Sequence, residues 1–391
     1  MEQFPEKLLV KLSERKDNNA LRSLPDSNPL VDFASNDYLG LAKNEDVFQH
    51  SLKMLKEYDF IRNGASGSRL LSGNHILYTE LEKKLCDFYE VEAALVFNSG
   101  YDANIGFFSS VPQRSDIVFY DEFIHASIRD GIRLGNAKSY KFKHNDLGDL
   151  IKKCEDGYTT PSGQGLSQNA GEVYIVTESV FSMDGDSPDL KKLITFCNAN
   201  NYHLVVDEAH AIGVYGKKGA GLLQETELQE QVFARIVTFG KALGCHGAAI
   251  LGSEKLKSYL VNYARSFIYT TGLSPHSVAT IIAAHHYLGS TEGTEVRKKL
   301  NENIEFLNQK LKNPNLKLKF IASNSAIHCC KIKGNDKVKR VSKSLQEKGF
   351  DVKPILSPTV PKGEERLRFC LHAFNSERQL KEVMNLLQSI I

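Results

Sequence analysis

Long apolar runs that alternate with helix-like segments constrain this chain more than any other feature. The clearest runs are AALVFN (93–98), DIVFYD (116–121) and YHLVVD (202–207), and they are flanked by amphipathic segments such as YTELEKKLCDFY (78–89) and DLKKLITFCNANN (189–201). Strands that are apolar throughout are buried on both faces, as in a mostly parallel sheet covered by helices on each side. The pattern therefore predicts an α/β fold built on a large, mostly parallel sheet.

The pattern of segments changes toward both ends of the chain, which indicates more than one domain. A chain of 391 residues also exceeds what one compact core usually holds. We expect an N-terminal helix and extended segment over residues 1–45, a large α/β domain over 46–273 and a smaller α+β domain over 274–391. Ser376 and Gln379 fit a capping box at the start of the last helix of the smaller domain.

Composition excludes several classes of protein. Lys plus Arg total 49 and Asp plus Glu total 47, so the net charge of +2 gives no reason to expect a nucleic acid or an anionic membrane as a partner. No apolar run approaches bilayer length, and the charged N-terminal segment does not read as a signal peptide. The seven cysteines form no CxxC pair, which is typical of reduced thiols. We expect a cytoplasmic protein without a bound metal.

The string VVDEAH (205–210) raises the possibility of a nucleotide hydrolase of the DEAH type, in which the acidic pair serves Mg²⁺ and water. Such an enzyme needs a phosphate loop of the form GxxxxGK[ST] on an earlier strand. The sequence contains no such loop. The GK pair at Gly240–Lys241 lies after VVDEAH, is followed by Ala242 and has Arg235 where the first glycine should be. We therefore exclude this class.

An acid and a lysine remain at the ends of two predicted strands. Asp207 ends one apolar run, and Lys241 follows another, RIVTFG (235–240). The carboxyl ends of parallel strands line one edge of a sheet, so both side chains reach the same edge. A plain ion pair is the ordinary alternative. However, the glycines of FGKALGCHG (239–247) leave room for a planar group, and a partly desolvated lysine can form a Schiff base.

This pair predicts pyridoxal phosphate (PLP), because PLP needs a lysine for its aldehyde and an acid that keeps its ring nitrogen protonated. Its phosphate would bind where strand 93–98 runs into Gly100 and Tyr101 at the start of a helix, although an ordinary turn is the alternative there. Thr238 could add a hydroxyl group. His125, which follows strand 116–121 on the same edge, could cover the face of the ring.

Two further side chains on this edge could bond near the phenolic oxygen of PLP. His210 lies one turn beyond Asp207, and Ser182 follows the apolar run EVYIVTES (172–179). His246 either faces the phosphate or lies in the core. Together these residues predict a compact cofactor site with Lys241 at its centre.

At this point the motifs together resemble the α-oxoamine synthases, a branch of the fold-type-I PLP enzymes, over nearly the whole chain. The fold implied is a large mostly parallel sheet domain followed by a smaller α+β domain. The motifs that carry the resemblance are SNDYLGLA (35–42), ASGSRLLSGNH (65–75), FNSGYDAN (97–104), HASIRDG (125–131), ESVFSMDGD (178–186), VDEAHAIGVYG (206–216), TFGKALG (238–244) and RLRFCL (366–371).

The resemblance implies a role for each candidate residue. Lys241, Asp207 and His125 would be the catalytic residues: the Schiff-base lysine, the partner of the ring nitrogen and the group stacked on the ring. Ser182 and His210 would bond near the phenolic oxygen, and Gly100, Tyr101 and Thr238 would bind the phosphate. The DEAH string replaces the DDAH that is common in the family, and we expect no catalytic change from Glu208.

The resemblance also implies substrate contacts and a homodimer with shared active sites. Thr271 would reach the phosphate bound by the neighbouring subunit. Asn36 and Arg368 would hold the carboxylate of an amino acid, a task that suits the planar fork of an arginine, although Arg368 could instead be a surface charge at a strand edge. Arg22 either meets the far end of an acyl chain or is a solvated helix residue.

The reaction implied by the resemblance is the decarboxylating condensation of an amino acid with an acyl thioester. The motifs RNGASGSRLLSGNH (62–75) and VFSMDGD (180–186) favour members that join L-alanine to a pimeloyl thioester in biotin synthesis. Members that join glycine to acetyl-CoA are the alternative, and the acyl carrier, CoA or a carrier protein, stays open. A non-catalytic binding protein that keeps the fold is the alternative from another class.

Overall fold

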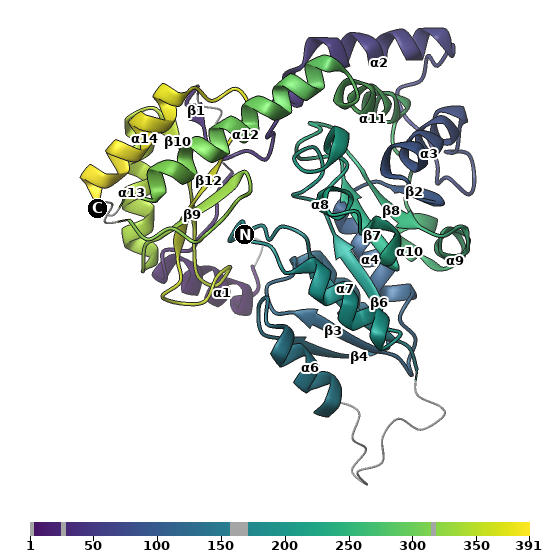
Figure 1. The fold of residues 1–391 in the computed structure, drawn as a ribbon, viewed down its shortest axis with the longest axis horizontal. Coiled ribbons are helices and arrows are strands. Elements are labelled where there is room, and N and C mark those ends of the chain that lie inside the picture. Colours follow the sequence, from purple (N-terminus) through teal and green to yellow (C-terminus); the bar gives the residue numbers. More distant parts are fainter. Residues whose placement is uncertain (1–3, 25–28, 157–170, 314–317) are drawn as a thin grey trace. The chain divides into compact units, whose positions relative to one another are not determined.

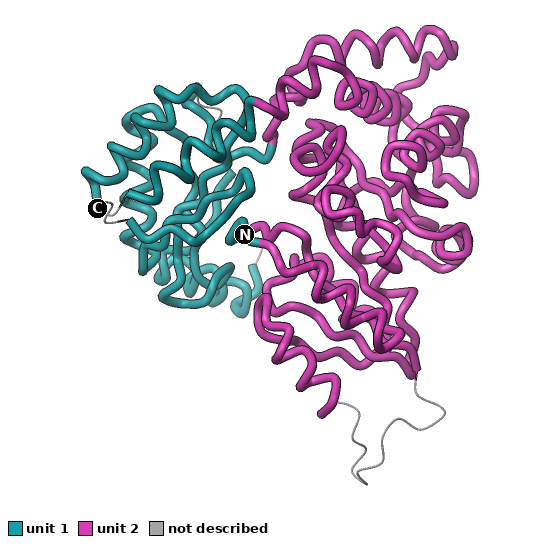
Figure 2. Tube along the Cα trace, viewed as in Figure 1, with its two compact units in different colours: residues 1–36, 183–186, 299–391 teal, residues 37–182, 187–298 magenta. Residues whose placement is uncertain are grey.

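The computed structural model describes residues 4–24, 29–156, 171–313 and 318–391. Contacts within the chain divide it into two compact units, which are described separately (Figure 2). Unit 1 contains residues 1–36, 183–186 and 299–391, and unit 2 contains residues 37–182 and 187–298. Among the described residues, no helix is long and apolar enough to cross a membrane.

The core of unit 2 is a seven-stranded sheet in the order β2-β8-β7-β6-β5-β3-β4 (Figure 1). Only β8 runs antiparallel to its neighbours β2 and β7, and all other pairs are parallel. The mostly parallel sheet predicted from the sequence is thus confirmed. The strands are β2 (Ala93–Phe97), β3 (Ile117–Asp121), β4 (Lys138–Phe142), β5 (Val173–Glu178), β6 (His203–Asp207), β7 (Ala234–Thr238) and β8 (Ala248–Gly252).

Both faces of this sheet are buried, because alternate residues of β3, β5 and β6 enter two different apolar clusters. Tyr174 and Val176 of β5 belong to one cluster, and Val173 and Ile175 belong to the other. The first cluster contains residues of α4 (Gly100–Ser110), α5 (Ala126–Leu134), α9 (Glu254–Tyr263) and α10 (Arg265–Ile268), and the second contains residues of α6 (Leu147–Asp156), α7 (Leu190–Ala199) and α8 (Leu222–Glu225). Helices therefore cover the sheet on both sides, as uniformly apolar strands require.

The remaining helices of unit 2 pack beside the sheet. α11 (Pro275–Leu288) contacts both α2 (Glu45–Glu57) and α3 (Ile76–Tyr89). α12 (Thr291–Leu311) begins in unit 2 and continues into unit 1. Three short 3₁₀ helices complete the described elements of this unit: η1 (Leu41–Lys43), η2 (Lys217–Gly219) and η3 (Gln229–Gln231).

Unit 1 is a smaller α+β body. Its antiparallel sheet has the order β11-β12-β9, formed by β11 (Lys353–Ile355), β12 (Arg366–Cys370) and β9 (Ile327–Lys331). A second sheet pairs β1 (Val31–Asp32) with β10 (Phe350–Asp351). The helices that lie wholly in unit 1 are α1 (Glu6–Asp17), α13 (Asn335–Glu347) and α14 (Glu377–Ile390). The capping box predicted at Ser376 and Gln379 is present at the start of α14.

The division into units differs from the expected boundaries 1–45, 46–273 and 274–391: residues 1–36 and 183–186 group with the C-terminal residues, and residues 37–45 and 274–298 group with the large sheet. The N-terminal segment groups with the C-terminal residues, because the N–H of Val31 donates to Gly349 O at 2.8 Å and β1 pairs with β10. Residues 274–298 group with the large sheet, because α11 packs on α2 and α3. Neither pairing leaves a local signal in the sequence, since each joins segments far apart along the chain.

Candidate active site

The carboxyl ends of four neighbouring strands bring polar side chains to one edge of the large sheet. The last residues of β3, β5, β6 and β7 are Asp121, Glu178, Asp207 and Thr238. Ligands of open α/β sheets bind at this edge. The site therefore follows from the order and direction of the strands.

Lys241 lies just beyond β7 and contacts His210. Its Nζ is 2.8 Å from Nε2 of His210, and Nδ1 of His210 is 2.7 Å from the phenolic oxygen of Tyr38. Tyr38 and His210 are both buried. The three side chains form one hydrogen-bonded chain that orients the histidine ring toward the lysine. Sequence reasoning did not single out Tyr38, although it lies in the quoted motif SNDYLGLA (35–42).

Asp207 is held by two N–H donors and is only 6% exposed. Oδ2 accepts from Nδ2 of Asn104 at 3.1 Å, and Oδ1 accepts from the backbone N–H of Ala209 at 2.9 Å. Asn104 also donates to Oγ of Ser127 at 3.0 Å, and that oxygen is 2.7 Å from Nδ1 of His125. Asp207 and His125 thus belong to one network. Asn104 and Ser127 were not predicted, because only packing of α4 against α5 brings them together.

His125 begins α5 as its N-cap, where its ring nitrogen accepts from the N–H of Ser127. Burial lowers the pKa of His125 below its usual value of 6.5, and the positive charge of Lys241 lowers it further, while Asp207 opposes the shift. The ring is therefore neutral at pH 7. A neutral imidazole at this position can cover a planar ring.

The N-terminus of a helix opens where β2 runs into α4. Ser99 caps the helix by accepting from the N–H of Asp102, and Gly100 and Tyr101 are its first residues. A Cβ atom at Gly100 would lie 3.6 Å from Oγ1 of Thr238, so the absence of a side chain keeps this space open. The Tyr101 hydroxyl donates to Asp130 at 2.8 Å, so an anion would meet the backbone of this residue.

The groups at this edge fit PLP. They include a lysine amine, a buried carboxylate, a neutral imidazole and a helix N-terminus beside a threonine hydroxyl. Ser182 follows β5 and is also buried. Thr271 is exposed and its carbonyl oxygen accepts from Nδ2 of Asn98 at 2.5 Å, which attaches its loop to the end of β2. The contact of Thr271 with a neighbouring subunit remains a prediction.

The backbone conformation requires two of the glycines after Lys241. Gly244 has φ +61°, and a Cβ atom there would lie 2.1 Å from the backbone nitrogen of Ala42. Gly247 has φ +114°, a conformation that other residues rarely adopt. That the glycines at 240, 244 and 247 also make room for a planar group stays a prediction. His246 is exposed, so its alternative placement in the core is wrong.

In unit 1, Arg368 and Asn36 contact each other. Nη2 of Arg368 donates to Oδ1 of Asn36 at 2.9 Å, and Nη1 lies 2.9 Å from Sγ of Cys370. Arg368 is 8% exposed on the central strand β12, so the alternative of a surface charge at a strand edge is wrong. Arg22 is exposed, contacts Oγ1 of Thr359 at 3.3 Å and follows the end of α1, so it is not a helix residue.

Glu208, from which we expected no catalytic change, forms a fully buried ion pair with Arg235. Its Oε2 lies 2.8 Å from Nε and 2.6 Å from Nη2 of Arg235. Arg235 also donates to the carbonyl oxygens of Tyr89 and Ala220, and Glu208 accepts from the N–H of Leu223. Glu208 therefore ties four segments of unit 2 together and has a structural role.

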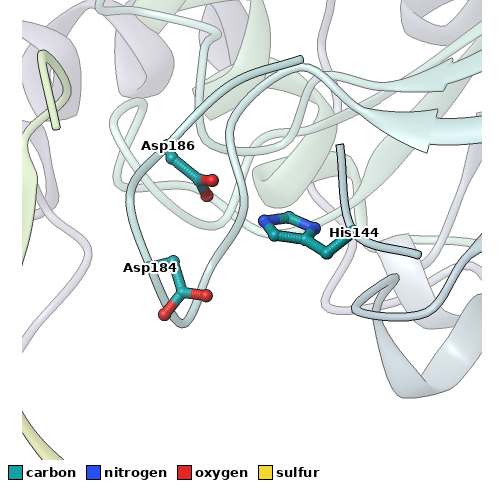
Figure 3. Close-up of side chains that lie close together, drawn as sticks. All are labelled: His144, Asp184 and Asp186. Atoms are coloured by element: carbon teal, nitrogen blue, oxygen red, sulfur yellow. The ribbon is translucent and has the colours of Figure 1, made fainter. Parts of the chain in front are cut away.

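Figure 3 shows His144, Asp184 and Asp186. Asp184 and Asp186 lie on the segment 183–186 of unit 1, where Asp184 forms an ion pair with Arg366. His144 belongs to unit 2, where its Nδ1 lies 2.9 Å from Oδ1 of Asp121. His144 and Asp184 thus each have an ionic partner within their own unit. That the chain binds no metal stays a prediction.

Comparison with known proteins places the chain in a family. The model of the aminotransferase class I and II family matches residues 28–387. An 8-amino-7-oxononanoate synthase of Emericella nidulans is 40% identical over 97% of this chain and 92% of its own length.

Two solved structures share the fold. A lysine-to-alanine variant of a serine palmitoyltransferase from S. paucimobilis, with a bound PLP–myriocin aldimine, superposes with a TM-score of 0.86 at 26% identity, covering 98% of this chain and 96% of that one. An 8-amino-7-oxononanoate synthase of Francisella tularensis has a TM-score of 0.76 at 28% identity, covering 93% and 98%. The chain therefore belongs to the aminotransferase class I and II family, within its α-oxoamine synthase branch of PLP enzymes.

Proposed function

We propose that this chain catalyses the decarboxylating condensation of L-alanine with a pimeloyl thioester, which gives 8-amino-7-oxononanoate, CO₂ and the free thiol of the carrier in biotin synthesis. The observation that carries the proposal is the convergence of Lys241, His210 and Asp207 at one sheet edge in a chain that is 40% identical to a protein named for this activity. When bound, PLP supplies an electron sink for the α-carbon of the amino acid.

Lys241 moves the protons of the reaction. Its amine removes the α-proton of the amino acid and later returns a proton to the product, and His210 keeps the amine in place through the 2.8 Å contact. Asp207 holds the proton on the ring nitrogen of PLP, because two N–H donors favour its charged form. His125 covers the ring and keeps water from it.

The other predicted residues bind rather than react. Gly100 and Tyr101, with backbone N–H groups, and Thr238, with its hydroxyl, hold the phosphate. Ser182 bonds near the phenolic oxygen. Arg368 holds the carboxylate of the amino acid with the help of Asn36, since the Asn36 contact fixes one end of the guanidinium fork. Arg22 meets the far end of the acyl chain, which its exposed position after α1 permits.

We further propose a cytoplasmic homodimer with shared active sites, in which Thr271 reaches the phosphate bound by the neighbouring subunit. The large domain predicted over residues 46–273 would bind PLP. The acyl carrier is either CoA or a carrier protein. Support for the cytoplasm comes from the seven cysteines, all of which lie in the described residues as free thiols.

A second candidate is the condensation of L-serine with a long-chain acyl thioester. The TM-score is higher for the serine palmitoyltransferase, 0.86 against 0.76, which favours it on backbone shape. Sequence identity favours the first candidate, because 40% to a named 8-amino-7-oxononanoate synthase exceeds 26% to the serine enzyme. Substrate choice depends on side chains, so identity is the better guide.

Thiol release tests the choice directly. The purified protein, loaded with PLP, is given L-alanine, glycine or L-serine with pimeloyl-, acetyl- or palmitoyl-CoA. We expect the highest kcat/KM for L-alanine with pimeloyl-CoA. A preference for glycine with acetyl-CoA would assign the chain to the alternative acetyltransferase activity, and L-serine with palmitoyl-CoA would assign it to the second candidate. PLP binding without thiol release from any pair would favour a non-catalytic binding protein.

A further inference from the structure

Glu178 is a buried acid at the centre of the site to which no role has been given so far. It is the last residue of β5 and is only 3% exposed. Its Oε1 accepts the backbone N–H of His125 at 2.6 Å. In the parallel ladder of β5 and β6 its register partner is Asp207. Glu178 therefore stands between the two residues that are proposed to contact the cofactor ring.

Titratable residues face Glu178 from every neighbouring element. Asp207 lies on β6, Asp121 ends β3, His125 begins α5 and Lys241 follows β7. Asp121 is itself held by Nδ1 of His144 at 2.9 Å and by the N–H of Asn145 at 2.8 Å. Burial, followed by the charge of Asp207, raises the pKa of Glu178 to about 8, while Lys241 and the His125 N–H oppose the rise.

Two buried carboxyl groups on paired residues of neighbouring strands do not both ionise at low cost. The difference between them lies in their hydrogen bonds. Asp207 accepts from Asn104 and from Ala209, and each donor favours its charged form. Glu178 accepts only one N–H, that of His125, through one oxygen, and the carbonyl oxygen of a neutral carboxyl group can still accept it. The proton of the pair therefore belongs to Glu178.

We propose that Glu178 is a positioning residue: its protonated carboxyl group holds the backbone of His125 and leaves Asp207 as the charged member of the pair. The role in catalysis rests on the proposed function, because it concerns the residues that contact PLP. The protonation itself is a property of the protein alone. An uncharged Glu178 also avoids a second negative charge beside the ring nitrogen, so that Asp207 alone sets the charge there.

The first experiment uses the protein without PLP, so its outcome does not depend on the proposed function. Difference infrared spectra are recorded between pH 5 and pH 10 for the wild type, Glu178→Gln and the control Glu80→Gln, which changes an exposed acid on α3. We expect a protonated-carboxyl band in the wild type and the control that disappears with a midpoint near pH 8, and no such band in Glu178→Gln. A wild type without this band, or a Glu178→Gln variant that retains it, would overturn the proposal.

The stability of the same variants gives an independent test. An acid whose pKa is raised from 4.5 to about 8 on folding keeps its proton in the folded state after it has lost it in the unfolded state. The free energy of unfolding of the wild type therefore falls between about pH 4.5 and pH 8. We expect the difference between Glu178→Gln and the wild type to shift in favour of the variant across this window. A difference that is constant with pH contradicts the proposal.

The positioning of His125 is tested by comparing two variants that both lack the charge. Gln keeps an oxygen that can accept the His125 N–H, whereas Leu does not. We expect the Kd for PLP to be at least about fivefold higher in Glu178→Leu than in Glu178→Gln, because Leu loses one hydrogen bond that contributes about 1 kcal/mol. Equal PLP affinity of the two variants would overturn the positioning role. Absence of PLP binding in the wild type would instead refute the proposed function.

Discussion

Asp207 and Glu208 are neighbours in the chain, but they belong to two regions that satisfy a buried charge in different ways. Glu208 meets a full opposite charge in Arg235, and every side of the pair is bonded to backbone groups. Asp207 has only neutral donors and lies beside a second acid, Glu178. The first region is complete without a ligand. The region around Asp207 has buried ionisable groups with shifted pKa values and, among the described residues, no full opposite charge bonded to Asp207. Catalytic sites commonly have such groups.

The largest expected effect is the loss of turnover in Lys241→Ala, because this change removes the group that moves protons at the strand-end edge. We expect thiol release to fall by about 10³-fold or more. PLP should still bind without a covalent bond, which equilibrium dialysis measures. If Lys241→Ala retained near wild-type turnover, the region around Asp207 and Lys241 would not be the catalytic one.

Substitutions in the buried ion pair of Glu208 and Arg235 should lower the stability of the fold rather than act on the reaction itself. Glu208→Gln leaves the charge of Arg235 uncompensated, and we expect the free energy of unfolding to fall by about 3–5 kcal/mol in urea denaturation. The double variant Glu208→Leu, Arg235→Leu should recover part of this loss, because it leaves no unpaired charge. If Glu208→Gln were as stable as the wild type and lost only turnover, the distinction between the two regions would fail.

Asn104→Ala sharpens the comparison, since it removes one of the two neutral donors to Asp207 and the link to Ser127. A hydrogen bond to a charged group contributes about 1.5–3 kcal/mol, so we expect kcat to fall about 10- to 100-fold. Asn262→Ala, on the exposed face of α9, is the matched control and should leave kcat within about twofold. A fall of similar size in both variants would show that the effect is not specific to Asp207.

The smallest expected effect concerns the arginine of unit 1. Cys370→Ala removes the 2.9 Å contact between Sγ of Cys370 and Nη1 of Arg368. Because such a hydrogen bond contributes about 1 kcal/mol, we expect KM for the amino acid to rise about fivefold, with little change in kcat. Cys330→Ala is the control. Cys330 is also a buried thiol, but its partner in the strand register is Leu367 and not Arg368. An unchanged KM in Cys370→Ala would mean that the thiol contact does not help to fix the guanidinium group.

The site residues that follow apolar strands could be predicted from the sequence. The residues that reach the site through packing between distant segments could not. Lys241 and Asp207 could be placed together because each follows an apolar strand. Strand β4 was missed because four of its five residues are exposed, so it has no apolar run. Strand β8 was missed because it follows the glycine-rich segment that was assigned to the cofactor.

The missed site residues have the same cause. Tyr38 is 172 residues from its partner His210 in the sequence, and Asn104 is 103 residues from its partner Asp207. Glu178 was inside a quoted motif, but its partner Asp207 is defined by the pairing of β5 with β6. Asn36 and Arg368 were expected only from family resemblance, since no periodicity links the two ends of unit 1.

The central claim is that the strand-end edge around Lys241 is the PLP site, and one measurement tests it most directly. The protein loaded with PLP is reduced with borohydride and digested, and the pyridoxyl group is located by mass spectrometry. The account predicts the label on Lys241 alone, with bleaching of the visible absorption band. A label on another lysine, or an unlabelled protein after PLP addition, would contradict it.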